Sequence, residues 1–235
     1  VALPEPGVTA AFPGLPADAL GDLGYLDTET SGLAGGTGTI AFNIGLLSWH
    51  QGGWRARQYL LTGFAGEGAM LDALAADLDG LSGLVTYNGG SFDLPLLRDR
   101  YRLHGVACAP LPALQPDLLH PVRRLFRTRW PDCRLATAER RLLGTLREHD
   151  LPGSDVPAVW FEWLRRGGAE RMPAVLAHNR QDLVSLLRLL PALAAAVEAP
   201  DAWGAMALGA ARAWLTDGHE GQAHAVLEAT AQRDA

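Results

Sequence analysis

Lysine is absent from the 235-residue sequence, so all 20 basic residues are arginine. A lysine-free composition can reflect the nucleotide bias of a genome as readily as a function. Cysteine is scarce as well, because Cys108 and Cys133 are the only two. Their spacing fits no metal-ligand motif, which predicts two reduced thiols and excludes a disulfide framework or a cysteine-based zinc site.

Long apolar runs are also missing. The most apolar segment, residues 183–197, is interrupted by Ser185, Arg188 and Pro191. No segment offers the roughly 20 apolar residues that a bilayer-spanning helix needs. The first residues, VALPEPGVTAAFPGLP, lack a basic stretch followed by a long apolar one, so no signal peptide is predicted. The sequence therefore predicts a cytoplasmic protein that does not associate with membranes.

Charge is distributed unevenly along the chain. With 48% hydrophobic and 20% charged residues, the composition suits a compact globule with a sizeable core. The net charge of −6 at first argues against a polyanionic partner. Residues 121–147, however, hold eight arginines and two acids, a net charge of +6, which leaves −12 for the rest of the chain.

The most basic stretch is RRLFRTRW, in which Arg123, Arg124 and Arg127 are interleaved with Phe126 and Trp130. Guanidinium groups bind phosphates and aromatic rings stack on bases, so this mixture predicts contact with nucleic acid. A solvated helix face is the alternative interpretation of the same residues.

Hydrophobic periodicity and turn residues predict three strands, then a helix, a strand and a helix, followed by a mostly helical remainder. This order is typical of an α/β fold of the ribonuclease H-like kind, a mixed sheet flanked by helices. The predicted strands are residues 24–27, 39–49, 54–61 and 83–88, and the predicted helices are residues 71–81, 92–103, 121–126, 135–143, 156–166 and 172–193.

Three segments follow from this pattern: an N-terminal extension (1–21), the ribonuclease H-like domain (22–198) and a C-terminal helical hairpin (199–235). The last segment consists of two Ala-rich helices around TDGHEG and is similar to one tetratricopeptide-type unit. A single unit cannot form a solenoid. The hairpin therefore either packs on the main domain or binds a protein partner.

Three short stretches place four acids and a histidine where they can meet. Asp27 and Glu29, in YLDTETSGL, are two positions apart in a strand, so their side chains share one face. Asp93 follows the turn in YNGGSFD and opens a helix, where it can also act as a capping acid. His178 and Asp182, in AHNRQDLVSLL, are four apart on a helix and share a face. Paired carboxylates require a cation, so a metal site is predicted.

Together, DTETSGL, YNGGSFD and HNRQD resemble the three sequence blocks of the DEDD superfamily of 3′-to-5′ exonucleases. Within it the chain most resembles the YprB-like branch of ribonuclease H-like proteins, through the intervening DCRLATAERRLLG and HDLPGSDVPAVWFEWLRRG. The resemblance extends over residues 22–195.

The resemblance implies that Asp27, Glu29, Asp93 and Asp182 hold two divalent cations, Mg²⁺ or Mn²⁺, which favour oxygen ligands. Asp27 would bridge both ions, Glu29 and Asp182 would complete one site, and Asp93 would act largely through bound water. Two such ions can stabilise the attacking and leaving oxygens of phosphodiester hydrolysis. His178 would be the general base that deprotonates the attacking water.

His178 departs from the family pattern. In the histidine subgroup this residue precedes the last Asp by five positions, whereas here it precedes Asp182 by four. One residue rotates a side chain by about 100° around a helix, so His178 takes the place where the tyrosine subgroup has its tyrosine. Two roles stay open: general base, or a hydrogen-bonding residue near the metals.

The resemblance also implies a pocket for the terminal nucleotide. Asn88, part of NGG, can equally be a turn residue. The residues assigned to this pocket are Thr30, Gly32, Leu33, Asn88 and Phe92.

The leading hypothesis is a metal-dependent exonuclease that acts at the single-stranded or frayed 3′ end of nucleic acid and releases nucleoside monophosphates. A structure-selective endonuclease on the same fold is a second enzymatic hypothesis. A non-catalytic nucleic-acid binder or an interaction module that uses the C-terminal helices is the non-enzymatic one. The sequence does not discriminate DNA from RNA.

Overall fold

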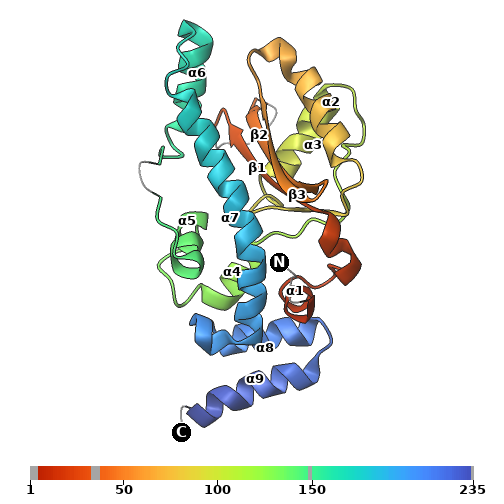
Figure 1. Ribbon diagram of the computed structural model, residues 1–235, viewed down its shortest axis with the longest axis vertical. Helices are drawn as coiled ribbons and strands as arrows, with labels where there is room; N and C mark the ends of the chain where they lie inside the picture. Colours follow the sequence, from red (N-terminus) through yellow and green to blue (C-terminus); the bar gives the residue numbers. More distant parts are fainter. Residues whose placement is uncertain (1–4, 33–37, 148–149, 234–235) are drawn as a thin grey trace. The chain divides into compact units, whose positions relative to one another are not determined.

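The computed structural model describes residues 5–32, 38–147 and 150–233 (Figure 1). The chain forms two compact units, each assembled from separate stretches of sequence. The sheet unit consists of Asp22–Gln115 and Arg147–Val184. The helical unit consists of Val1–Gly21, Pro116–Leu146 and Ser185–Ala235.

The sheet unit is built on four strands in the order β3-β2-β1-β4. Neighbouring strands β1, β2 and β3 are antiparallel, whereas β4 pairs with β1 in parallel. An isolated parallel bridge from Gly83 to Leu114 continues the sheet beyond β4. The strand bounds are Leu23–Thr30 (β1), Ala41–His50 (β2), Gly53–Leu60 (β3) and Gly83–Val85 (β4).

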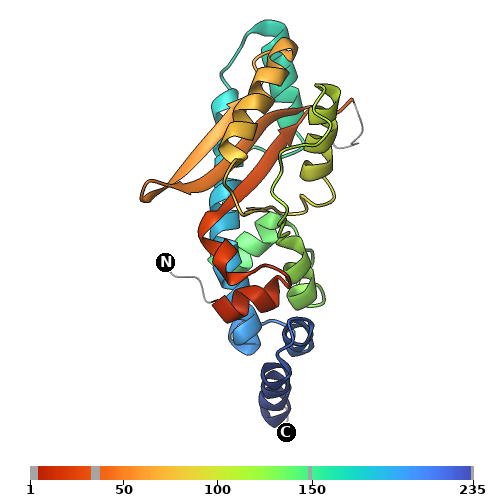
Figure 2. The same ribbon diagram turned by 90° about the vertical axis from the view of Figure 1, so that its right-hand side faces the viewer.

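Helices cover both faces of this mixed sheet. Helices α2 (Glu67–Leu78) and α3 (Asp93–Leu103) lie on one face, and the first part of α7 (Met172–Glu198) lies on the other, as two perpendicular views agree (Figures 1 and 2). Helix α6 (Val156–Arg166) contributes Trp160 to the core of this unit. The sheet and its helices thus form the mixed α/β arrangement that the sequence predicts.

The core of the sheet unit follows from the apolar periodicity of its elements. Leu71, Leu74 and Leu78 recur at helical spacing on α2, and all three are buried. Trp160 stacks on Phe42 of β2 at 4.9 Å between ring centroids, and its indole N–H donates to the carbonyl of Leu61 at 3.0 Å. Burial of these large aromatic side chains stabilises the core of the sheet unit.

The helical unit contains the later part of α7 together with short helices from the start, the middle and the end of the chain. Helices α8 and α9 contact each other and form the C-terminal hairpin. Ser185 of α7 donates a hydrogen bond to the buried carboxylate of Glu139. The elements are α1 (Glu5–Ala11), α4 (Leu119–Phe126), α5 (Leu135–Ala138), a π-turn (Glu139–Leu143), η4 (Pro200–Trp203), α8 (Ala207–Thr216) and α9 (Glu220–Arg233). The short helix η1 (Ala17–Asp22) ends in sequence at the first residue of the sheet unit.

Two local expectations differ from the structure. The Pro- and Gly-rich start of the chain contains helix α1, which hydrophobic periodicity does not predict. The strand expected at residues 83–88 ends at Val85, because Asn88 has a φ of +65° and the chain turns there.

Within the described residues no helix is long and apolar enough to cross a membrane. The domain limits at residues 21 and 198 stay a prediction.

Candidate active site

Strand β1 presents Asp27 and Glu29 on the face of the sheet that α7 covers. In the register of β1 with β2, Asp27 lies opposite Gly45 and Glu29 opposite Asn43. A Cβ atom at Gly45 would lie 2.3 Å from Oδ1 of Asn179. The glycine therefore lets α7 approach the strands closely enough for its side chains to reach the carboxylates.

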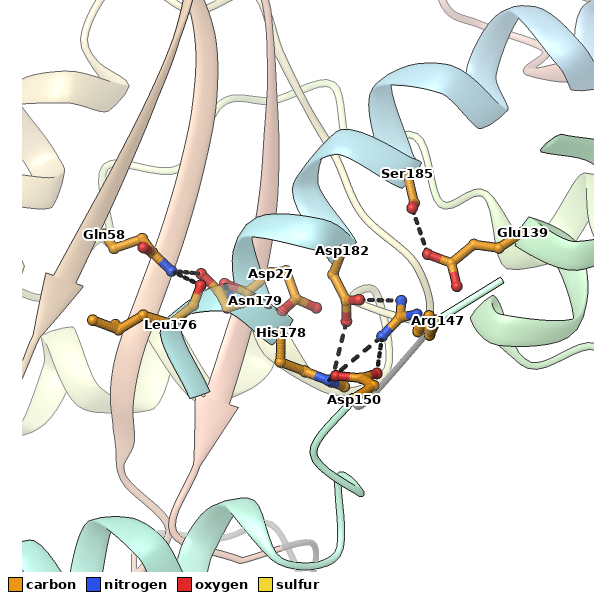
Figure 3. A network of polar contacts seen from close by, with 10 residues as sticks. All are labelled: Asp27, Gln58, Glu139, Arg147, Asp150, Leu176, His178, Asn179, Asp182 and Ser185. Atoms are coloured by element: carbon orange, nitrogen blue, oxygen red, sulfur yellow. Dashed lines mark hydrogen bonds and ion pairs between the residues drawn. The ribbon is translucent and has the colours of Figure 1, made fainter. Parts of the chain in front are cut away.

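Asn179 connects α7 with this end of the sheet. Its amide nitrogen donates to Oδ2 of Asp27 at 2.8 Å and to the carbonyl oxygen of Asp27 at 3.2 Å. Its amide oxygen accepts from Nε2 of Gln58 on β3 at 2.9 Å, and Gln58 also donates to the carbonyl of Leu176 at 2.8 Å (Figure 3). This chain of hydrogen bonds fixes the orientation of Asp27.

Asp93 is the first residue of α3 and is buried. The hydroxyl of Thr28 on β1 donates a hydrogen bond to Oδ1 of Asp93. The N-cap residue of α3 is Phe92, which makes no side-chain capping hydrogen bond. Asp93 therefore lies inside the helix and is joined to the strand that holds Asp27 and Glu29.

His178 and Asp182 lie one turn apart on α7, with Nε2 of the imidazole 3.7 Å from Oδ2 of Asp182. The other ring nitrogen, Nδ1, is 2.7 Å from Oδ1 of Asp150. Arg147 completes the group, because its guanidinium donates to Oδ1 of Asp182 and, at 3.0 Å, to Oδ2 of Asp150 (Figure 3). Arg147 thus supplies positive charge to two acids.

Burial and the charges of neighbouring acids both act on the pKa values of the carboxylates. Burial raises the pKa of Asp27 well above its usual range, and the charges of Asp182, Glu29 and Asp93 raise it further. Burial also raises the pKa of Glu29 to about 7; Asp182, Asp93 and Asp150 add to this rise, and His178 opposes it. The four acids predicted from the sequence are therefore brought into one repelling cluster.

The charge of Asp182 and a hydrogen bond to Asp150 raise the pKa of His178 above its usual value, against the lowering effect of burial. The pKa of Asp150 moves the other way, because its bonds to His178 and Arg147 outweigh burial. The imidazole therefore lies between acids on two sides.

The donor set fits a divalent cation in its chemistry. Oε1 of Glu29 and the amide of Asn43, opposite it on the same face, are buried without a hydrogen-bond partner among the described residues. Such atoms need a polar ligand. In the arrangement seen here, no three acids, histidines or cysteines of the described chain converge tightly enough to hold one ion. Thr28 engages Asp93 and Arg147 engages Asp182, so a cation would have to displace Arg147.

The residues expected to bind the terminal nucleotide flank the cluster in sequence. Thr30 ends β1 and its hydroxyl donates to the carbonyl of Gly32 at 2.9 Å. Asn88 adopts the turn conformation, and Phe92 is half-buried just before α3. Leu33 lies outside the described residues.

The three arginines expected to contact substrate, Arg123, Arg124 and Arg127, lie in the helical unit, whereas the carboxylates lie in the sheet unit. Phe126, expected to stack on bases, is fully buried and stacks on Trp130 at 4.2 Å. That part of the sequence interpretation is wrong, since the ring belongs to the core.

Three further residues at the site escaped the motif search: Arg147, Asp150 and Asn179. Arg147 belongs to the basic segment 121–147, Asp150 precedes the sequence LPGSDVPAVW, and Asn179 directly follows His178. Arg147 and Asp150 contact each other, but the predicted site residues that they and Asn179 bind lie 28 to 152 positions away in sequence. A polar residue next to each motif is the only signal that could have drawn attention to them.

Known proteins give three relevant comparisons. The profile of the RNase_H superfamily matches residues 24–194. YprB of Bacillus subtilis (strain 168) is 34% identical over 169 residues, which are 72% of this chain and 41% of YprB. The structure of the family B DNA polymerase from the hyperthermophilic archaeon Pyrobaculum calidifontis superposes with a TM-score of 0.53 at 15% identity, over 83% of this chain and 28% of the polymerase. At that identity the likeness concerns the fold alone.

Proposed function

Because this chain belongs to the RNase H superfamily, we propose that it is a metal-dependent nuclease, and more narrowly a 3′-to-5′ exonuclease that releases nucleoside monophosphates from single-stranded nucleic acid. The observation that carries the proposal is the cluster of Asp27, Glu29, Asp93 and Asp182. A protein that only binds nucleic acid gains nothing from such a cluster, because carboxylates repel phosphate.

Ribonuclease H-like nucleases generally use divalent metal ions. In this chain Asp27, Glu29, Asp93 and Asp182 would hold them, and hard oxygen ligands favour Mg²⁺ or Mn²⁺. Bound ions would supply positive charge against the negative charge that develops on the phosphoryl group and the leaving oxygen. Arg147 would release Asp182 when the ions bind.

His178 is the residue that accepts the proton of the attacking water in this proposal. Its Nδ1 is held by Asp150 at 2.7 Å, which leaves Nε2 as the basic nitrogen of the neutral ring, on the side of Asp182. Asp150 is a positioning residue, because it acts through the imidazole. Asn179 positions Asp27 in the same sense.

The nucleotide at the 3′ end would lie against the segments that follow β1 and precede α3. The proposal assigns these contacts to Thr30, Gly32, Leu33, Asn88 and Phe92. A Cβ at Gly32 would have no atom within 4 Å, so there is open space beside this residue. A terminal base or sugar can use that space.

The test is a time course with single-stranded oligonucleotides in Mn²⁺, with EDTA as the blank. A 3′-labelled strand should release labelled mononucleotide at once, and a 5′-labelled strand should give a ladder that shortens with time. A circular single strand should stay intact. Cleavage of the circle would make the protein an endonuclease, and no cleavage of any substrate in Mn²⁺ or Mg²⁺ would make it a binder.

Variants assign this activity to the cluster. Asp27→Asn and Asp182→Asn should each lower the rate by about 100-fold or more, because each would remove charge that holds the metal. Asp72→Asn is the matched control, since Asp72 is an exposed acid of α2 in the same unit. If Asp27→Asn and Asp182→Asn cleave as fast as Asp72→Asn and the wild type, the carboxylate cluster has no role in the reaction.

A further inference from the structure

The helical unit contains a cavity of about 340 Å³ between α4 and α8. These helices lie side by side and contact each other (Figure 1). Four arginines line the cavity and no acidic residue does. Three of them are Arg123, Arg124 and Arg127, which the sequence predicts to contact nucleic acid. The fourth, Arg212, lies on α8 of the C-terminal hairpin, for which the sequence predicts only packing or a protein partner.

The charges in this cavity are not compensated. Elsewhere in the described chain, arginines such as Arg57, Arg100 and Arg233 form ion pairs with carboxylates. Arg123, Arg127 and Arg212 are exposed, and their side chains make no hydrogen bond or ion pair with another described residue. Four like charges around one cavity repel each other, so an anion that neutralises them is favoured.

Arg124 is the inner member of this group. It is half-buried, its guanidinium makes one long hydrogen bond of 3.5 Å to the carbonyl of Ala11, and burial lowers its pKa. A cation held in partly buried surroundings with one weak acceptor gains from an anionic partner.

The backbone fixes the distance between the two helices. A Cβ at Gly209 would lie 2.3 Å from the carbonyl oxygen of Arg124, so only glycine allows α8 to pack this tightly against α4. The backbone N–H of Met206 also donates to the carbonyl of Leu125 at 2.8 Å. Arg212 follows Gly209 by three residues and shares its helix face, so it is held toward the arginines of α4.

We propose that this cavity binds the phosphodiester backbone of a nucleic-acid strand and that Arg212 of the C-terminal hairpin completes it. Guanidinium groups match phosphate oxygens with paired hydrogen bonds. Since Phe126 is buried, base stacking from that ring does not contribute, and the contact is independent of base sequence. The choice of nucleic acid as the anion rests on the proposed function.

The experiment measures binding of a fluorescent 20-nucleotide single strand by anisotropy in EDTA, where no hydrolysis occurs. The cavity variant is Arg123→Gln/Arg127→Gln/Arg212→Gln. The matched control is Arg134→Gln/Arg140→Gln/Arg141→Gln, which removes the same charge from exposed arginines of the same unit outside the cavity lining. Circular dichroism and melting temperature establish that both variants fold.

The cavity variant should raise Kd by about tenfold or more and lower the slope of log Kd against log salt by about 2, because each lost contact with a single strand removes about 0.7. The control should change both quantities much less. Equal effects of the two variants would overturn the proposal, because binding would then follow overall charge.

Competitors identify the anion. Unlabelled oligonucleotide should displace the probe, whereas inorganic phosphate and poly-L-glutamate at equal charge should not. Full displacement by phosphate would indicate a free-phosphate site, and displacement by polyglutamate would indicate an acidic protein partner; either result contradicts the proposal. In the wild-type chain, oligonucleotide should also protect Arg212 from phenylglyoxal, as read by mass spectrometry, and an unprotected Arg212 would argue against it.

This test is independent of catalysis. If the oligonucleotide binds at the cavity but is never cleaved, the proposed function fails and the cavity assignment stands. If cleavage occurs and the cavity variant binds as wild type does, the cavity assignment fails alone.

Discussion

Asp150 determines which nitrogen of His178 faces the carboxylate cluster. With Nδ1 held by Asp150, the neutral ring carries its proton there and keeps Nε2 as the acceptor. A general base in the other tautomer would present an N–H to the attacking water. The contribution of Asp150 is therefore to the orientation and pKa of another residue.

Asp150→Asn should lower kcat by about 10-fold to 100-fold, the range for residues that orient an imidazole, with little change in KM. Because the bond to Asp150 raises the pKa of His178, its loss should also move the acidic limb of the pH–rate profile to lower pH. Steady-state kinetics from pH 5 to 9 check both effects.

Asp155→Asn is the matched control for this variant, since the Asp155 side chain is 51% exposed in the same unit. If the pH limb of Asp150→Asn coincides with that of the wild type, Asp150 has only a structural role. Asp150→Glu, which keeps the carboxylate, should restore part of the rate.

Stability should depend on pH through Glu29. Its pKa is about 7 in the folded chain and lower when unfolded, so the folded state binds the proton more tightly. Its contribution to the free energy of unfolding is full at low pH and is lost as pH rises through 7; Asp27 acts in the same direction.

Melting temperatures in EDTA should therefore fall between pH 5 and pH 8, and Mn²⁺ should reverse the fall at pH 8. The Glu29→Gln variant should show a smaller fall and a weaker response to Mn²⁺. A melting temperature in EDTA that rises across this interval would contradict the assignment.

Short motifs could identify Asp27, Glu29, Asp93, His178 and Asp182, because strand and helix periodicity places such neighbours on one face. The same reasoning could not find Asp150 or Asn179. Each contacts a predicted site residue far along the chain, His178 for Asp150 and Asp27 for Asn179, and these contacts exist only after packing. The assignment of a role to these residues needs the folded structure.

At the scale of elements, the closeness of α7 to the sheet depends on Gly45. An added methyl group there would meet Oδ1 of Asn179 at 2.3 Å and Cδ1 of Leu183 at 2.8 Å. Asn179 would have to move, and with it the hydrogen bonds that orient Asp27.

Gly45→Ala should therefore lower stability by about 1–3 kcal/mol, the usual cost of overpacking, and reduce activity. Chemical denaturation and the nuclease assay measure the two effects. Gly53→Ala is the matched control, because a Cβ at this strand glycine has open space around it. Wild-type stability in Gly45→Ala would show that α7 does not need this close approach.

Most elements could be predicted because their periodicity is strong. The hairpin of β2 and β3, helix α6 and helix α7 all lie close to their expected bounds, and the ribonuclease H-like fold is confirmed. Helix α1 could not be predicted, since its seven residues include Pro and Gly and carry no amphipathic pattern. Its stability comes from packing against α8.

At the scale of the whole molecule, the two proposed ligands belong to different compact units. Mn²⁺ would bind acids of the sheet unit, and phosphate groups would bind arginines of the helical unit. Each ligand should therefore slow the hydrogen exchange of backbone amides in the unit that binds it.

Hydrogen exchange read by mass spectrometry should separate these effects. Mn²⁺ alone should slow exchange in β1 and in residues 172–184 of α7, and oligonucleotide in EDTA should slow exchange in α4 and α8. The Arg123→Gln/Arg127→Gln/Arg212→Gln variant should lose only the second effect. Protection by Mn²⁺ in α8 but not in β1 would contradict the assignment of the metal to the carboxylates.

Strand β3 is an edge of the four-stranded sheet, and an edge strand offers unpaired backbone groups to other chains. Arg55 and Arg57 lie on this strand beside Asp77 of α2, with Arg57 bonded to its carboxylate. Charged side chains on an edge discourage pairing with a second molecule. We therefore expect these two arginines, which take no part in the proposed chemistry, to disfavour pairing of β3 with the sheet edge of a second molecule.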